Sequence, residues 1–409
     1  MRILLLTDLY EPIIGGLERH VQRLGRELTH RGHEVAVVTM AQSGAPAGQS
    51  WDDLRVHRIR GWSSARGLAK DPERRFHPPF PDPGAVAALK RVYALEKPDI
   101  VHAHSWILFS ALAPATRGEA ALVATLHDFG AVCPKKTLLH PSEGICSGPG
   151  TLKCIRSARE QYGLLKALPL TVGLHVSERL YRHVDRFIAV SSSVAGATAH
   201  ALREQPIDVI PNFVEDALLD EQPTIAPAGR RSIVFAGPLS RHKGIHVLLE
   251  AWQRLPQPRP PLLLLGTRAP DTPRSWPRGV DVRENVAHPE VMAELARARV
   301  AVLPSIMADA CPTVALEAMA AGTPLVASAA GGLLDMVRDG RSGLLVPPRD
   351  ASALAAAMGR LFADDALWTR IAENARANVA RFTASEVVPR IEATYAAALG
   401  IRTKAPAAN

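Results

Sequence analysis

Residues 300–327 read VAVLPSIMADACPTVALEAMAAGTPLVA, and this stretch predicts the fold. Its beginning, Val300–Pro304, is apolar throughout, as expected of a strand that helices cover on both faces. A helix is expected to begin near Thr313, and a second strand is expected at Pro324–Ala327. A strand, a helix and a strand in this order predict a parallel βαβ unit.

The same alternation of strands and helices continues through the chain. Further strands are expected at Arg2–Thr7, Glu34–Thr39, Arg55–Ile59, Asp99–His104, Leu122–His127, Phe187–Ser191, Asp208–Pro211, Ser232–Ala236, Leu262–Leu265, Val280–Arg283 and Leu344–Val346. Periodic apolar residues predict helices at Leu17–Arg31, Ala351–Phe362, Leu367–Phe382 and Glu386–Leu399, and residues Arg402–Asn409 are expected to be disordered.

The length of the chain predicts two domains. A chain of 409 residues is too long for one ordinary core, so two domains of roughly 200 residues are expected. Residues Glu215–Arg230 are rich in Pro, Ala and acidic residues and lack periodicity, so they are interpreted as the linker. The predicted fold class is α/β, with two Rossmann-like domains facing each other across a cleft, the usual place for a ligand.

Charge and hydropathy exclude several classes of protein. The formal charge is +8, from 48 Lys and Arg against 40 Asp and Glu, but the basic residues are scattered, so no nucleic-acid partner is expected. No apolar run approaches the roughly 20 residues of a membrane-spanning helix. The N-terminal residues turn acidic at Asp8 and Glu11, too early for a signal peptide, so the expected location is the cytoplasm.

Cysteine and histidine spacing predicts no metal centre. Cys133, Cys146 and Cys154 lie close in sequence, but none forms the close pair typical of zinc sites, so structural thiols are expected there and at Cys311. A loop clipped by a metal or by redox chemistry is the alternative. The histidines are dispersed, and no D-x-D motif follows a strand, so no metal is expected.

The loop and helix of the opening stretch carry the chemistry. A helix that begins near Thr313 presents unpaired N–H groups and the positive end of its dipole to a pyrophosphate. Because Pro312 has no N–H, Thr313 and Val314 are the expected donors. Glu317 is expected on the first helical turn, where its carboxylate can accept two ribose hydroxyls, and Asp309 can face a sugar. The alternative is an ordinary helix with a solvated loop acid.

At this point the sequence resembles a known family. Asp309 and Glu317 form a D-x7-E pattern that resembles the E-x7-E signature of retaining glycosyltransferase family 4, which implies the GT-B fold. In that family the first acid holds hydroxyls of the donor sugar and the second holds the ribose. Asp309 is one methylene shorter than the usual Glu, a change that bears on which sugar is preferred.

Other motifs of the second half also resemble the family. Residues 235–244, FAGPLSRHKG, resemble the G-R-L-x3-K-G loop, whose basic side chains neutralise the donor diphosphate, which implies that role for Gly237 and Lys243. The Arg of the family is Pro238 here, and Arg241 is the candidate replacement. Residues 331–337, GGLLDMV, resemble the GGxPExV element, with Asp335 in the place of Glu.

The first half resembles the family in two loops. Residues 8–18, DLYEPIIGGLE, resemble its P-x-x-G-G-x-E loop, which implies that Gly15 and Gly16 contact the donor phosphate or the acceptor. His127, within the T-x-H-D element at residues 125–128, is expected at the cleft, against the donor or the developing oxocarbenium charge. Acceptor-binding candidates are Glu11, Asp128 and Lys135, the last in an insertion at residues 133–154 expected to flank the acceptor site.

The resemblance implies how the domains divide the work. Residues 1–214 are expected to form the acceptor-binding domain, with a helix at residues 385–401 crossing back onto it. Residues 231–384 are expected to bind the donor. The expected catalytic residues are His127, Asp309 and Lys243, and the donor-binding residues are Gly15, Gly16, Gly237, Arg241, Lys243, Asp309, Pro312, Thr313, Val314 and Glu317.

The expected activity is retaining transfer of a hexose from a nucleotide-diphosphate sugar, UDP before GDP. The acceptor is unidentified: lipid-linked, a polysaccharide or a small secondary metabolite. No cofactor or metal is expected beyond the nucleotide-sugar cosubstrate, and peripheral contact with a membrane is expected if the acceptor is a lipid. Alternatives are a sugar-nucleotide epimerase or phosphorylase of the same architecture and a catalytically weak binding protein. A nicotinamide enzyme lacks its GxGxxG fingerprint here.

Overall fold

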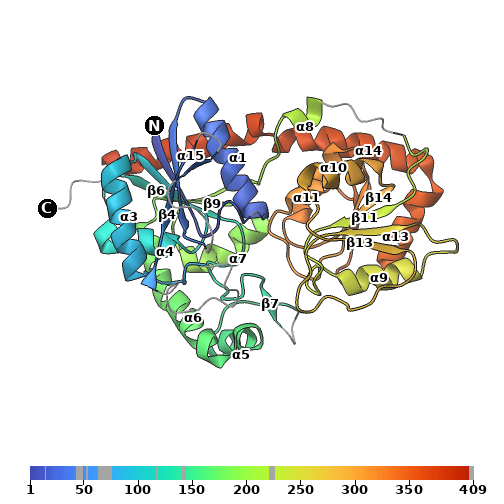
Figure 1. Cartoon of the computed structure of the whole chain (residues 1–409), viewed down its shortest axis with the longest axis horizontal. Coiled ribbons are helices and arrows are strands. Elements are labelled where there is room, and N and C mark those ends of the chain that lie inside the picture. The colour runs from blue at the N-terminus through green and yellow to red at the C-terminus, as the bar shows by residue number, and fades with distance from the viewer. Residues whose placement is uncertain are drawn as a thin grey trace. The chain divides into compact units, whose positions relative to one another are not determined.

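The computed structural model describes residues 1–13, 15–42, 49–51, 54–62, 76–116, 118–140, 144–220 and 226–404. It divides into unit 1, Met1–Pro211 with Val387–Asn409, and unit 2, Asn212–Glu386. Each unit is a parallel sheet flanked by helices (Figure 1). Unit 2 begins at Asn212, ahead of the predicted linker Glu215–Arg230, and within this unit Val214 N–H donates to Phe382 O.

Unit 1 is built on an eight-stranded sheet in the order β10-β9-β6-β5-β1-β2-β4-β3. Its first seven strands in this order are parallel, and β3 pairs with β4 antiparallel at the edge. The strands are β1 Arg2–Thr7, β2 Glu34–Met40, β3 Gln49–Trp51, β4 Leu54–Ile59, β5 Ile100–Ala103, β6 Ala121–Leu126, β9 Arg186–Ala189 and β10 Ile207–Val209. All seven predicted strands are confirmed, whereas the short edge strand β3 was not predicted.

The helices of unit 1 include an inserted pair, α5 and α6, below the sheet in Figure 1. They follow the short hairpin of β7 Leu139–His140 and β8 Gly144–Ile145. The helices are α1 Gly16–His30, α3 Pro83–Glu96, α4 Leu108–Ala111, α5 Thr151–Tyr162, α6 Leu164–Ser177, α7 Ser192–Leu202 and most of α15 Ala384–Lys404.

The last helix, α15, is joined to unit 1 by side-chain contacts. Tyr395 hydroxyl lies 2.7 Å from Nδ1 of His102, and Thr394 hydroxyl donates to Asp208 at 2.9 Å. The helix continues to Lys404, so the prediction of a disordered tail from Arg402 is wrong for residues 402–404, and residues 405–409 lie outside the described residues. Helix-forming Arg and Lys extend the final turns although no apolar periodicity marks them.

Unit 2 has a six-stranded parallel sheet in the order β13-β12-β11-β14-β15-β16, the Rossmann order. Its strands are β11 Ile233–Ala236, β12 Leu262–Leu265, β13 Val280–Arg283, β14 Val300–Leu303, β15 Leu325–Ser328 and β16 Leu344–Val346. Helix α9 Ile245–Gln253 lies on one face of the sheet, and α10 His288–Arg297 and α11 Thr313–Ala320 lie on the other (Figure 1). The remaining helices are α8 Ala217–Asp220, α12 Leu333–Met336, α13 Ala351–Ala363 and α14 Asp365–Val379.

In both sheets the strand order reverses at one point, which is called the topological switch point. In unit 2 the order reverses between β11 and β14, and in unit 1 it reverses between β1 and β5. The loops that leave the carboxyl ends of these strands run to opposite faces of the sheet and leave a crevice between them. The predicted α/β fold of two Rossmann-like domains is confirmed, and the residues expected to bind ligands follow β11 and β14.

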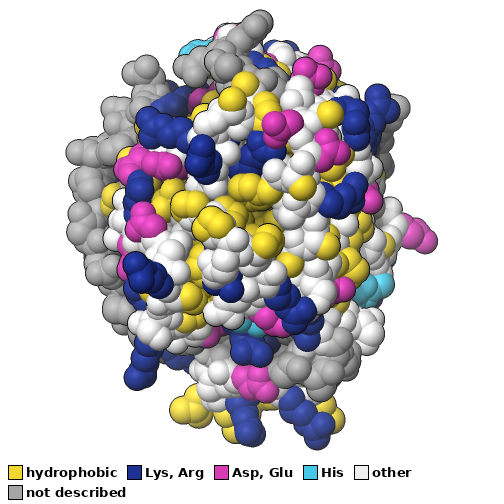
Figure 2. Space-filling model, turned by 90° about the vertical axis from the view of Figure 1, so that its right-hand side faces the viewer, with side chains coloured by type: hydrophobic (Ala, Val, Ile, Leu, Met, Phe, Trp, Pro, Cys, Tyr) yellow, Lys and Arg dark blue, Asp and Glu magenta, His cyan; other side chains and the backbone are white. Residues whose placement is uncertain are grey.

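The surface of unit 2 carries charges of both signs. On the face shown in Figure 2, Lys and Arg are interspersed with Asp and Glu. Arg268 pairs with Glu284 and Arg283 pairs with Asp281 at exposed sites, and Arg283 also pairs with the half-buried Glu294. Among the described residues, no helix combines the length and the apolar composition that crossing a bilayer requires.

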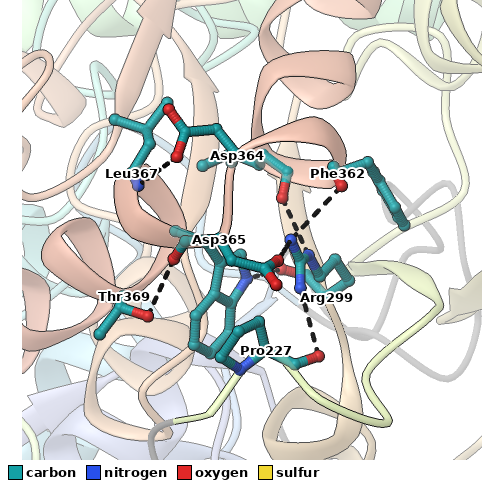
Figure 3. A network of polar contacts seen from close by, with 9 residues as sticks. Pro227, Arg299, Phe362, Asp364, Asp365, Leu367 and Thr369 are labelled. Carbon is teal, nitrogen blue, oxygen red and sulfur yellow. Dashed lines mark hydrogen bonds and ion pairs between the residues drawn. The ribbon is translucent and has the colours of Figure 1, made fainter.

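A buried arginine fixes helices α13 and α14 to the sheet of unit 2 (Figure 3). Arg299, only 5% exposed, donates to Leu361 O at 2.8 Å and to Pro227 O at 3.2 Å, and its Nη2 lies 2.5 Å from Asp365 Oδ1. Its own carbonyl accepts from Nε1 of Trp368 at 2.7 Å. Because several carbonyls share this one guanidinium, its loss would leave them buried without a donor.

We expect Arg299→Met to destabilise unit 2 by about 2–4 kcal/mol, because methionine fills the space but donates no hydrogen bond. The control is Arg283→Met, which removes only the ion pairs of an exposed arginine and should cost less than about 1 kcal/mol. Urea denaturation of both variants measures the difference. Equal losses would show that the buried network contributes no more than a surface pair.

Candidate functional site

The loops that follow β11 and β14 are in direct contact at the switch point of unit 2. Gly244 has a φ of +78°, and a Cβ there would lie 1.8 Å from Pro304 O. Only glycine therefore allows the Lys243 loop to approach the end of β14 this closely. Ile306 N–H donates to His242 O at 3.0 Å and closes the contact. The loops that contain Lys243 and Asp309 are thereby held side by side.

Both the carboxylate and the backbone carbonyl of Asp309 accept hydrogen bonds within unit 2. One carboxylate oxygen accepts from Lys243 Nζ and the other accepts from Ser305 Oγ, and the residue is 4% exposed. Its backbone carbonyl accepts from Gly332 N–H at 2.6 Å. The structure thus brings two predicted catalytic residues, Asp309 and Lys243, into one buried ion pair. Ser305, the third member, was part of the quoted motif but was not predicted as a site residue.

Helix α11 begins at Thr313 as predicted, directly after Pro312. The N–H groups of Thr313 and Val314 fall in its first turn, before the regular i→i−4 ladder, and both residues are half-buried. These two N–H groups can therefore donate hydrogen bonds to an anion, as expected of a helix N-terminus.

Glu317 is the fifth residue of α11, so it lies just past the first turn, on which it was expected. Its carboxylate is 3% exposed, and Oε1 lies 2.9 Å from Nε2 of His288, the first residue of α10. A buried carboxylate requires such a partner. His288 escaped prediction because it belongs to a different βα connection, and no motif marks it.

Pro238 and Arg241 are exposed, but hydrogen bonds hold their loop in place. Arg241 N–H donates to Asp271 Oδ2 at 3.0 Å, and Thr272 hydroxyl donates to Leu239 O. At Gly237, with a φ of +147°, the carbonyl packs so tightly that a Cβ on Gly266 would lie 1.8 Å from it.

Arg241 and Arg349 place positive charge near the N-terminus of α9. Burial lowers the pKa of His246, and the charges of Arg241 and Arg349 lower it further. Arg241 and Arg349 therefore place positive charge near the predicted diphosphate loop despite Pro238. The acidic side chains of Glu250 and Asp271 lie near it as well. Arg349 was not predicted, because it lies beyond the motifs of the family.

Unit 1 gathers histidines at its own switch point. His104 follows β5, His127 follows β6 and His20 lies on α1, and their ring nitrogens come within 4.8 Å of one another. Nδ1 of His104 is 3.0 Å from Nε2 of His127. The interpretation of the histidines as dispersed is wrong in three dimensions, because neighbouring parallel strands end at the same edge of the sheet.

Burial keeps His20 and His104 neutral. It lowers the pKa of His20 and of His104 well below the usual value, and the neighbouring histidines lower both further. His102, which lies 2.7 Å from Thr125 hydroxyl, has its pKa lowered by burial to about 3. These three side chains are therefore uncharged hydrogen-bonding groups at physiological pH.

The other predicted residues of unit 1 lie in loops, except Gly16, which is the first residue of α1. Gly15 is the N-cap of α1, and a Cβ on Gly16 would meet nothing within 4 Å, so no close approach in unit 1 requires glycine at position 16. Glu11 is buried, at 8% exposed. Asp128 accepts from Gly130 N–H at 2.6 Å, and Lys135 donates to Leu139 O and to Ser157 hydroxyl, so both side chains also hold their own loop together.

The four cysteines are free thiols. Burial raises the pKa of Cys133 and of Cys154, which disfavours the thiolate form. This agrees with the expectation of structural thiols at both positions.

The fold recurs in solved glycosyltransferases. Sucrose-phosphate synthase from Thermosynechococcus elongatus shares it with a TM-score of 0.76 and 22% identity over 98% of this chain and 99% of that one. Anabaena Alr3699/HepE, solved in complex with UDP-glucose, shares it with a TM-score of 0.69 and 20% identity over 96% and 99% of the two chains. The protein thus has the GT-B fold.

Matches of sequence identify the family. Residues 14–218 match the model of Glycosyltransferase Family 4, and residues 230–364 match Glycosyl transferases group 1. The chain belongs to glycosyltransferase family 4. It is 29% identical to glycogen synthase of Mycobacterium tuberculosis over 403 residues, which cover 92% of this chain and 89% of that protein.

The approach of Gly331 to Asp309 can be tested against a matched glycine. A Cβ at Gly331 would lie 2.2 Å from Asp309 O, whereas one at Gly340, which has a similar φ, would meet nothing within 4 Å. We expect Gly340→Ala to cost about 1–2 kcal/mol from backbone strain alone and Gly331→Ala to cost clearly more. Urea denaturation measures both, and indistinguishable losses would contradict the close approach.

Proposed function

We propose that the protein transfers a hexose, with retention, from a UDP-sugar to an acceptor hydroxyl. The observation that carries the proposal is the buried grouping of Lys243, Asp309 and the N-terminus of α11 at the switch point of unit 2. A helix N-terminus with an adjacent lysine suits a diphosphate. UDP is preferred to GDP because the solved relative HepE binds UDP-glucose.

Each residue of unit 2 has a proposed role in donor binding. The N–H groups of Thr313 and Val314 hold the diphosphate, next to Pro312 and Gly237. Lys243 neutralises it, and Arg241 supplies the charge that Pro238 lacks. Glu317, oriented by His288, accepts the ribose hydroxyls.

The ion pair between Lys243 and Asp309 is the proposed switch between the empty and the loaded site. Both groups bond to each other in the structure. An incoming diphosphate would compete for Lys243 and release one oxygen of Asp309 to accept from a sugar hydroxyl. Ser305 keeps the other oxygen in place. Donor binding and sugar recognition are then coupled through one lysine.

The proposed chemistry needs no metal ion at the diphosphate. The acceptor oxygen bonds to the anomeric carbon on the face from which the diphosphate leaves, so the configuration is retained. The bond from carbon to the phosphate oxygen breaks with its electron pair on the diphosphate, which takes up the proton of the acceptor. Lys243 and the dipole of α11 stabilise the leaving charge. His127 in unit 1 is assigned to the sugar, with Gly15 and Gly16 on the loop after β1.

We expect UDP to raise the melting temperature of the wild type equally with and without EDTA. A ligand at a hundredfold excess over its Kd stabilises by ~2.7 kcal/mol, so the shift is readily measured. Lys243→Met should abolish most of it, whereas Lys153→Met, which removes an exposed lysine of unit 1, should leave it unchanged. A panel with GDP and ADP identifies the base.

Three outcomes would count against the proposal. No shift with any nucleotide would mean that Pro238 has disabled the site. A UDP shift without product over a broad panel of acceptors would favour a binding protein, and conversion of the donor without an acceptor, seen by NMR, would favour an epimerase.

We further propose that α5 and α6 bring unit 1 to an anionic membrane, where a lipid-linked acceptor would lie. Exposed apolar side chains run along these helices, among them Leu165 at 91%, Leu152 at 72% and Val176 at 63%. Residues 151–183 contain six basic residues against two acidic ones. Apolar exposure with an excess of positive charge is typical of a helix that lies in the membrane interface. A second copy of the chain would bring like charges together.

Vesicle sedimentation tests this surface. The wild type should bind vesicles of phosphatidylglycerol more strongly than vesicles of phosphatidylcholine, and less so at high salt. Leu165→Asp with Leu168→Asp should reduce binding at least tenfold. Leu334→Asp, at an exposed apolar position of unit 2, is the control and should leave binding unchanged. Equal loss in both variants, or no preference for the anionic lipid, would contradict the proposal.

A further inference from the structure

The histidine cluster of unit 1 has the chemistry of a metal site. His20, His104 and His127 each offer a ring nitrogen within 4.8 Å of the others. Three elements contribute, namely α1 and the ends of β5 and β6. Three imidazoles with a further position open are a known ligand set for Zn²⁺.

The distances suit one ion after small side-chain movements. Two ligands of a tetrahedral zinc, each about 2.0–2.1 Å from the metal, lie roughly 3.3 Å apart. Nδ1 of His104 and Nε2 of His127 already lie 3.0 Å apart. A hydrogen bond between two neutral rings uses one proton, and a metal ion would take the place of that proton.

One ring nitrogen of His104 is left without a partner in the described part of the chain. His104 is 1% exposed, and its Nε2 has no hydrogen-bond partner among the residues that the structure describes. Such a buried polar atom is uncommon, and it would gain a partner only if His104 bound the ion through Nε2 instead of Nδ1.

The charged groups near the cluster bear on which fourth ligand a bound ion would take. Arg23 adds positive charge near His20, which opposes a cation held by neutral ligands alone. Asp8, 2% exposed at the end of β1, adds a carboxylate at the same edge of the sheet, and its Oδ2 has no partner among the described groups. An anionic fourth ligand, hydroxide or a phosphate oxygen, would complete the balance.

We propose that His20, His104 and His127 bind one divalent transition-metal ion of the zinc class. The ion is separate from the diphosphate site of unit 2, which has its own cations. Where His127 serves the transfer as proposed above, the ion would occupy it and slow the reaction. Binding itself does not depend on that role, so the failure of one proposal leaves the other standing.

Direct metal binding tests the site. Protein without an affinity tag is treated with a chelator, dialysed against Zn²⁺ or Co²⁺ and analysed for bound metal, and the visible spectrum of Co²⁺ reports its coordination geometry. We expect one equivalent in the wild type and at least tenfold weaker binding in His20→Gln and in His104→Gln. His57→Gln is the matched control, because this histidine of β4 pairs with Glu96 outside the cluster, and it should bind as the wild type does.

Two further measurements test whether the ion binds at the histidines and not elsewhere in the chain. A variant with Cys133, Cys146 and Cys154 changed to Ser should retain the ion, and loss of binding there instead would overturn the proposal. Zn²⁺ should also raise the melting temperature of the wild type by linkage but not that of His20→Gln, whose folding is checked by its circular dichroism spectrum and its cooperative thermal unfolding. Binding that is equal in the wild type and the histidine variants would refute the site.

Discussion

The bonds made by Asp309 join three loops at the switch point of unit 2. Its carboxylate joins the loops after β11 and β14 through Lys243 and Ser305, and its carbonyl joins the loop after β15 through Gly332. Three strand ends thereby converge on one residue. A buried carboxylate without such partners would cost several kcal/mol, so the loops cannot separate without penalty while the site is empty.

This arrangement explains why the sequence predicts unit 2 so well. Val300–Leu303 and Leu262–Leu265 are short apolar runs that can form only buried strands, and glycines such as Gly244 mark places where backbones touch. Local patterns therefore specify the elements. The contact between Glu317 and His288 could not be predicted from the sequence. The two side chains meet only because α10 packs on α11, and no local pattern encodes this packing.

In unit 1, by contrast, the sequence did not predict which site residues lie together. His20, His104 and His127 lie far apart in sequence, and spacing alone made them look unrelated. The missing information was the order of the strands, since β5 and β6 are neighbours and end at the same edge. An H-x-H pair that closes one strand and a histidine that closes the next would have predicted the contact between His104 and His127, although not the arrival of His20 from α1.

The two units use one topology to create opposite environments. Each places its polar groups at the carboxyl ends beside a reversal in strand order. In unit 2 the groups are ions held in pairs, with cations to spare at Arg241 and Arg349, which suits a diphosphate. In unit 1 burial keeps His104 uncharged, which suits hydrogen bonding to a sugar or ligation of a metal. Asp309 and His104 are both buried, so the division of chemistry between the units follows from which side chains meet at each strand end, and the shared fold does not determine it.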